Sequence, residues 1–79
     1  MLEFELLSDD GDKLTYRYLC EGSAEDSGEV DFARSKGDVT AVRKAEADKR
    51  GSYWGHLARR LREFLDSGEF KPSGIVAWY

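Results

Sequence analysis

The segment Ser52–Asp66 constrains the fold more than any other part of the chain, because it describes one amphipathic helix. At about 100° per residue its apolar side chains fall within an arc of roughly 140°. These apolar residues are Tyr53, Trp54, Leu57, Ala58, Leu61, Phe64 and Leu65. A single helix of this length is marginal in water. We therefore expect its apolar stripe to pack on a sheet formed by the flanking segments.

The ends of this helix are marked by glycine. Gly51 and Ser52 are predicted to supply a break and an N-cap. Gly68 fits the left-handed position after the last turn, and Phe70 is placed to pack back on that turn. The residues 45–50 are ambiguous, since their composition suits the end of a strand, a loop or an early helical turn.

Alternating apolar and polar residues predict strands on both sides of the helix. Leu2, Phe4 and Leu6 share one face of the first strand, and the Asp-Gly chemistry of residues 8–12 predicts a hairpin turn after it. Residues 21–28 lack periodicity and are expected to form the longest loop, whereas 35–38 and 71–74 have turn composition. The later strands are predicted at 14–20, 29–34, 39–45 and 75–79.

The predicted order is β-β-β-β-α-β within one small α+β domain spanning 1–79. Short connections favour an antiparallel β-meander of the first four strands. The amphipathic helix is expected to pack on one face of this sheet. The pattern leaves open whether the C-terminal fifth strand pairs with the first strand or the fourth.

The composition argues against several kinds of site. One cysteine, Cys20, and one histidine, His56, can form neither an internal disulfide nor a structural zinc site. A secreted domain of this size normally carries disulfides, and no export signal or membrane-spanning run is apparent. We therefore expect a cytoplasmic protein with no metal and no cofactor.

The residues that catalysis would use have simpler interpretations. Cys20 continues the apolar face of its strand and is expected in the core. His56 lies on the polar side of the helix, close to Arg59 and Arg60, with no identifiable carboxylate to orient it. The acidic run 9–12 lacks the spacing and the distal glutamate of an EF-hand. The protein is therefore predicted not to be an enzyme.

Charge is distributed unevenly along the chain. Residues 1–31 carry a net charge of −8, whereas residues 32–62 carry +6. Attraction between two parts of one domain explains this asymmetry, but a basic surface for an anionic partner also fits. The alternative function is therefore a nucleic-acid-associated protein using the basic segment 43–62. Its candidate residues are Arg43, Lys44, Arg59, Arg60 and Arg62.

The preferred function follows from the C-terminal segment 75–79, in which five consecutive residues are apolar. A strand sends alternate side chains to opposite faces, so some of these residues must project from the face without the helix. Leu7 and Leu19 are expected on that face too, and a contiguous apolar patch there indicates a binding surface. We therefore predict a protein-protein interaction or self-association module, with a protein partner or a homodimer contacting Leu7, Leu19, Trp78 and Tyr79.

Overall fold

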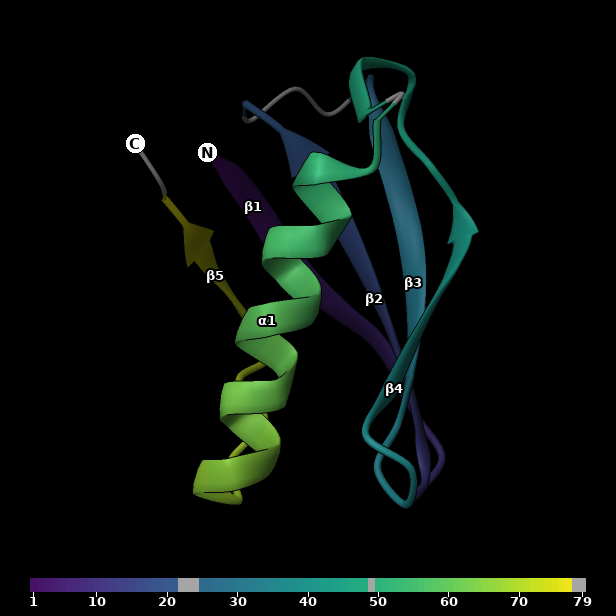
Figure 1. The fold of residues 1–79 in the computed structure, drawn as a ribbon, viewed down its shortest axis with the longest axis vertical. Coiled ribbons are helices and arrows are strands. Elements are labelled where there is room, and N and C mark those ends of the chain that lie inside the picture. Colours follow the sequence, from purple (N-terminus) through teal and green to yellow (C-terminus); the bar gives the residue numbers. More distant parts are fainter. Residues whose placement is uncertain (22–24, 49, 78–79) are drawn as a thin grey trace.

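The computed structural model describes residues 1–21, 25–48 and 50–77, and it confirms the predicted α+β fold. Five antiparallel strands form one sheet, and one helix covers one of its faces (Figure 1). The strand order is β4-β3-β2-β1-β5, so the fifth strand pairs with the first. The elements are β1 (Leu2–Asp9), β2 (Lys13–Cys20), β3 (Ser27–Ala33), β4 (Asp38–Arg43), the 3-10 turn η1 (Glu46–Asp48), α1 (Ser52–Ser67) and β5 (Ser73–Val76).

The core lies between α1 and the inner face of the sheet, as the period-2 pattern predicted. The sheet contributes alternate residues that are fully or nearly buried, and α1 contributes its apolar stripe. The ring of Phe4 lies 5.8 Å from those of both Tyr16 and Phe64, joining the two layers. The cluster contains Leu2, Phe4, Leu14, Tyr16, Tyr18, Cys20, Val30, Phe32, Ala45, Leu57, Leu61, Phe64 and Val76.

The start of α1 differs from the prediction. Gly51, with φ of 76°, occupies the N-cap position, and no side chain at that position caps the helix. Asp48 does so from the preceding η1 turn, accepting hydrogen bonds from the backbone N–H groups of Tyr53 at 2.9 Å and Trp54 at 3.0 Å. A buried carboxylate thus satisfies two of the N–H groups that a helix leaves unpaired.

The end of α1 confirms the prediction. Gly68 adopts φ of 80°, and its N–H donates to the carbonyl oxygen of Phe64 at 2.8 Å. The ring of Phe70 then packs 6.1 Å from Phe64 and 5.5 Å from Phe32. This contact turns the chain back toward the sheet edge where β5 begins.

The fifth strand begins earlier than predicted. Ser73 and Gly74, which have turn composition, belong to β5, and Gly74 pairs with Phe4. A β-carbon on Gly74 would lie 2.9 Å from the Phe4 ring, so close packing of the two strands requires glycine here. The predicted Trp78 and Tyr79 lie outside the described residues.

Two irregularities in the sheet interrupt its regular pairing at exposed apolar side chains. The register between β1 and β2 shifts between Leu6 and Ser8, which leaves Leu7 as an extra residue, 47% exposed. The pairing of β3 with β4 shifts in the same way, leaving Val42 as an extra residue, 55% exposed. Each bulge adds one residue to its strand, and neither extra side chain belongs to the core.

Burial raises the pKa of three core groups, and this predicts loss of stability at alkaline pH. It raises the pKa of the Cys20 thiol from 9.0 to about 11 and the pKa of Tyr16 from 10.0 to about 12, and it also raises that of Tyr18. The unfolded chain therefore loses these protons at lower pH than the folded chain does. The stabilisation is complete below about pH 9 and is lost progressively as the pH rises through the raised values.

Urea denaturation followed by circular dichroism on either side of this range checks the prediction. We expect a lower free energy of unfolding at about pH 11.5 than at about pH 8. Tyr16→Phe, which removes one of the three groups, should make the decline above pH 10 shallower. An equal free energy of unfolding at the two pH values would contradict the prediction.

Candidate binding edge

The outer face of the sheet, opposite α1, is crossed by a row of alternating charges. Cross-strand pairing aligns Glu5, Arg17, Glu29 and Arg43 from β1 to β4. Arg17 forms an ion pair with Glu5, and Arg43 lies 3.7 Å from Glu29. Opposite charges on neighbouring strands stabilise their pairing. This charged row occupies the middle of the outer face.

The two predicted leucines lie on opposite sides of the charged row. Leu19 pairs with Glu3, which in turn pairs with Ile75 of β5. Leu7 lies in the β1 bulge beyond the row, so the structure does not bring it next to Leu19. The other two predicted residues of this surface, Trp78 and Tyr79, lie outside the described part of the chain.

The register of β5 decides which of its apolar residues faces outward. Val76 is buried beneath α1, whereas Ile75 is 54% exposed on the outer face. Ile75 and Leu19 line a pocket of about 310 Å³, together with Glu3, Glu5 and Ser73. The apolar run 75–79 required some of its residues to face outward, and the register of β5 selects Ile75.

One side of β5 carries backbone groups that point out of the sheet. The N–H of Leu6 donates to the carbonyl oxygen of Pro72 at 2.7 Å. Opposite residues in an antiparallel pair alternate between hydrogen-bonded and non-hydrogen-bonded positions, so Gly74 and Val76 are the next residues that bond to β1. The N–H and C=O groups of Ser73 and Ile75 therefore point away from β1. No strand within the described residues pairs with that side.

The two edges of the sheet differ: β4 carries a bulge and charged residues, whereas β5 is regular, uncharged and four residues long. β4 is distorted by the bulge at Val42, and the side chain of Arg43 folds back to the carbonyl oxygen of Ser27 at 3.0 Å. Bulges and charges are common devices that prevent an edge strand from pairing with another chain. β5 has no charged residue, and its pairing with β1 is regular. β5 is therefore the edge that accepts another strand most readily.

A groove separates β5 from the flank of α1, and basic side chains line it. We call it the helix–edge groove; its volume is about 220 Å³, and it is lined by His56, Arg59, Arg60, Glu63, Val76 and Ala77. The four helix residues form one stripe at spacings of three and four residues. Arg60 pairs with Glu63 at 3.5 Å. Figure 1 shows α1 and β5 side by side along this edge.

Comparisons with protein-family models, curated proteins and solved structures found no match to this chain. None of its helices in the described ranges has the length and apolar character needed to cross a lipid bilayer.

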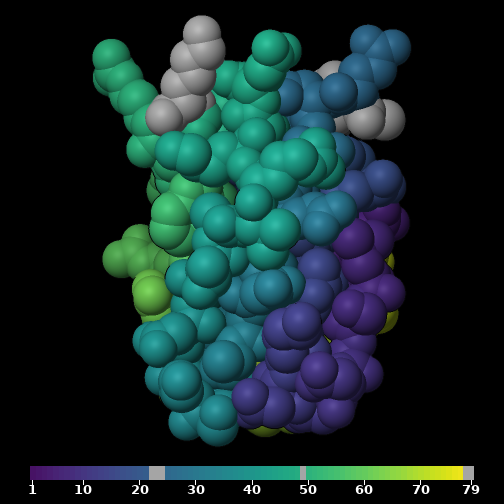
Figure 2. All heavy atoms as spheres, turned by 90° about the vertical axis from the view of Figure 1, so that its right-hand side faces the viewer, coloured from purple at the N-terminus to yellow at the C-terminus, as the bar shows by residue number. Residues whose placement is uncertain are grey.

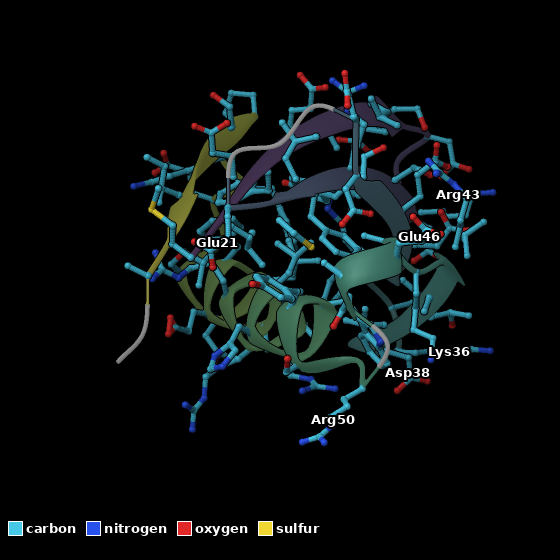
Figure 3. The ribbon with its side chains drawn as sticks, turned by 90° about the horizontal axis from the view of Figure 1, so that it is seen from above. Glu21, Lys36, Asp38, Arg43, Glu46 and Arg50 are labelled. Atoms are coloured by element: carbon cyan, nitrogen blue, oxygen red, sulfur yellow. The ribbon has the colours of Figure 1, made fainter. Side chains whose placement is uncertain are left out.

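The basic residues of the alternative function are divided between two edges of the sheet. Arg43 ends β4 and Lys44 follows it, whereas Arg59 and Arg60 lie beside β5 at the other edge. Figure 3 shows Arg43 and Arg50 at separate places on the rim, with the acidic Glu46 and Asp38 among them. Arg62 is exposed on α1 outside the helix–edge groove. The segment 43–62 therefore does not form one continuous basic surface.

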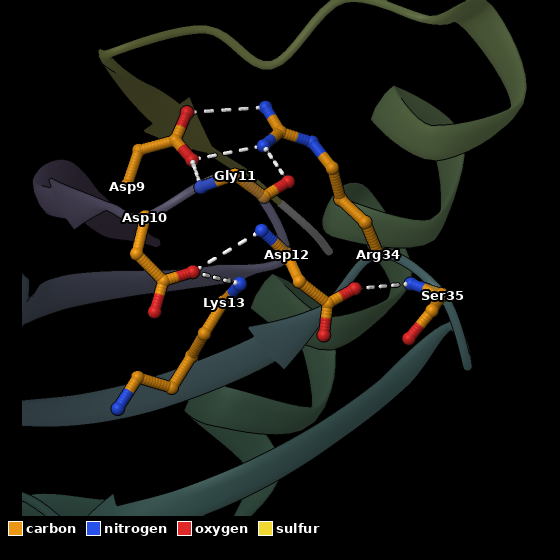
Figure 4. A network of polar contacts seen from close by, with 7 residues as sticks. All are labelled: Asp9, Asp10, Gly11, Asp12, Lys13, Arg34 and Ser35. Atoms are coloured by element: carbon orange, nitrogen blue, oxygen red, sulfur yellow. Dashed lines mark hydrogen bonds and ion pairs between the residues drawn. The ribbon is translucent and has the colours of Figure 1, made fainter.

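The carboxylates of the acidic turn between β1 and β2 are engaged in hydrogen bonds that stabilise the turn. Asp9 and Asp10 accept hydrogen bonds from backbone N–H groups within the turn (Figure 4). Asp9 also accepts from both terminal nitrogens of Arg34, at 2.8 and 3.1 Å. These bonds tie the β1–β2 turn to the β3–β4 turn, and the two hairpins lie side by side in Figure 2. They also hold the pKa of the Asp9 carboxyl below its usual value.

Cys20 and His56 lie in different parts of the molecule, and Glu63 lines the same groove as His56. Cys20 is buried in the core, as predicted, and burial raises the pKa of its thiol. His56 lies on the half-buried flank of α1, in the helix–edge groove. Among the described residues, no group of three or more His, Cys, Asp or Glu side chains is arranged to hold a metal ion.

Sequence reasoning missed the most buried polar residue, Asp48. Besides capping α1, its carboxylate accepts the hydroxyl of Tyr18 at 2.8 Å, and that hydroxyl accepts the N–H of Ala45 at 3.1 Å. The only sequence signal was an acidic residue shortly before a helix that begins with glycine. This hydrogen-bond network stabilises one end of the core, so the role of Asp48 is structural.

Proposed function

We propose that this protein is a non-enzymatic, cytoplasmic interaction module that binds a protein partner by adding a strand to β5. One observation carries the proposal: β5 is a regular edge strand whose outward N–H and C=O groups lie beside the exposed Ile75. An extended segment of a partner gains main-chain hydrogen bonds at such an edge, and its alternate side chains supply specificity.

The surroundings of β5 support this mode of binding. A partner strand would place alternate side chains on the outer face, next to Ile75 and the pocket that Leu19 also lines. The remaining side chains would point toward the helix–edge groove. Both faces of an added strand would thus have side chains to contact.

The test uses a substitution that blocks strand addition and leaves the fold intact. The N–H of Ile75 points away from β1, so Ile75→Pro removes one outward donor without breaking the β1–β5 pairing. Ile75→Val is the matched control, because it keeps the donor and an apolar side chain. A random twelve-residue peptide library is displayed and selected on the immobilised wild-type protein.

We expect the selected peptides to bind wild type and Ile75→Val alike and to bind Ile75→Pro at least about tenfold more weakly, since one main-chain hydrogen bond and the close approach of the strand are lost. Circular dichroism verifies that the variants are folded. Peptides that bind Ile75→Pro as tightly as wild type, or a selection that enriches no peptide, would overturn the proposal.

A further inference from the structure

The helix–edge groove indicates which charge the side chains of a partner strand should carry. We infer that the strand added at β5 is acidic, with carboxylate side chains on the face that meets α1. This inference rests on the proposed function. It goes beyond it by naming the residues that select the partner, Arg59 and Arg60.

The geometry sets which side chains of an added strand meet the arginines. Residues opposite one another in paired strands project to the same face of the sheet. Partner residues opposite Gly74 and Val76 would therefore lie on the inner face, next to the flank of α1.

The charges of the groove favour an anionic occupant. Arg59 and Arg60 both line it, and Glu63 is the only acidic residue among the described residues of its lining. Glu63 lies 3.5 Å from Arg60, and no carboxylate of the described chain forms an ion pair with Arg59. The groove therefore keeps net positive charge, although the whole protein has a formal charge of −4. A carboxylate at alternate positions of a partner strand complements this charge.

The same charges argue against a second copy of this chain as the occupant. Two β5 strands paired antiparallel would form one continuous sheet, with both helices on the same face. Each helix would then turn its groove flank, with Arg59 and Arg60, toward the other. Like charges facing one another across an interface disfavour it, so we assign the edge to a different, acidic chain.

Three synthetic octapeptides, blocked at both ends, test the inference. Each alternates valine with one other residue, which is glutamate, glutamine or lysine. Their dissociation constants are measured by titration calorimetry for wild type and for the double variant R59Q/R60Q. R62Q is the matched control, because Arg62 is an exposed arginine of α1 outside the groove.

We expect wild type to bind the glutamate peptide about tenfold more tightly than the glutamine peptide, and the lysine peptide most weakly. R59Q/R60Q should remove the preference for glutamate and leave binding of the glutamine peptide unchanged. R62Q should retain the preference. Backbone amide signals that shift on binding should include those of Ser73 and Ile75.

Different results separate failure of the inference from failure of the proposed function. If the three peptides bind equally and Ile75→Pro abolishes binding, strand addition stands and the acidic preference is wrong. If the glutamate peptide binds Ile75→Pro as tightly as wild type, both are wrong. Absence of binding by all three peptides also overturns the inference.

A nucleic acid is the remaining anionic occupant, and the same variants distinguish it. A twelve-nucleotide single-stranded DNA that binds through phosphate contacts would show a steep loss of affinity with salt. The inference is overturned if this oligonucleotide binds more tightly than the glutamate peptide at 150 mM salt and Ile75→Pro leaves its binding unchanged. In that case the arginines bind a nucleic acid.

Discussion

Replacing Asp48 with alanine is expected to lower the free energy of unfolding by about 3 kcal/mol. The carboxylate is 1% exposed and accepts three hydrogen bonds, from the Tyr18 hydroxyl and from the N–H groups of Tyr53 and Trp54. Alanine leaves these donors without their acceptor at the start of α1. A domain of this size has roughly 4–12 kcal/mol of stability in total, so the loss is a large fraction of it.

Asp26 provides a matched control for this prediction. Its carboxylate also accepts two backbone N–H groups, those of Glu46 at 2.6 Å and Ala47 at 2.9 Å, but at an exposed position. Asp26→Ala should cost only about 1 kcal/mol, because water can replace the lost acceptor. Urea denaturation measures both variants. If Asp48→Ala and Asp26→Ala lower the free energy of unfolding equally, burial does not increase the contribution of the Asp48 hydrogen bonds to stability.

Gly28→Ala is expected to destabilise the protein by a similar amount, about 3 kcal/mol. Gly28 pairs with Tyr18 across β2 and β3, and a β-carbon on Gly28 would lie 2.4 Å from the Tyr18 ring. The ring cannot move aside freely, because its hydroxyl is bonded to Asp48 and Ala45. The added methyl group therefore forces the strands apart or breaks the buried hydrogen bonds.

The same substitution at Gly55 should stabilise the protein instead. Gly55 lies within α1, and nothing lies within 4 Å of the position of an added β-carbon. Gly55→Ala should raise the free energy of unfolding by about 1 kcal/mol, which is the difference in helix propensity between the two residues. Thermal and urea denaturation of both variants provide the comparison. A Gly28→Ala protein as stable as wild type would refute the close packing of Tyr18 on Gly28.

Local periodicity was sufficient to predict the elements and their order. The apolar arc of 52–66 and the alternation at Leu2, Phe4 and Leu6 depend only on residue spacing, because one face of each element must leave water. The glycine at position 68 likewise predicted the end of α1, since its left-handed backbone is a property of one residue. These features do not require knowledge of what lies across the core.

The candidate site was less accessible to sequence reasoning. Alternation predicted only that Leu7 and Leu19 share a face, whereas strand pairing sets Leu19 opposite Glu3 and so puts the charged row between the two leucines. The basic residues 43–62 are close in sequence, but β4 and β5 lie at opposite edges of the sheet. Surfaces formed by residues distant in the chain depend on register and strand order, which spacing does not encode.

Residue spacing is enough to specify a two-layer α+β domain, because apolar side chains at periods of two and 3.6 residues must be buried along one face of each strand and helix. The pairing of β5 with β1, the outward position of Ile75 and the capping of α1 by Asp48 are set by the folded molecule. These outcomes depend on contacts between distant residues, such as Phe4 against Gly74 and Tyr18 against Asp48. Such contacts exist only once the chain has folded.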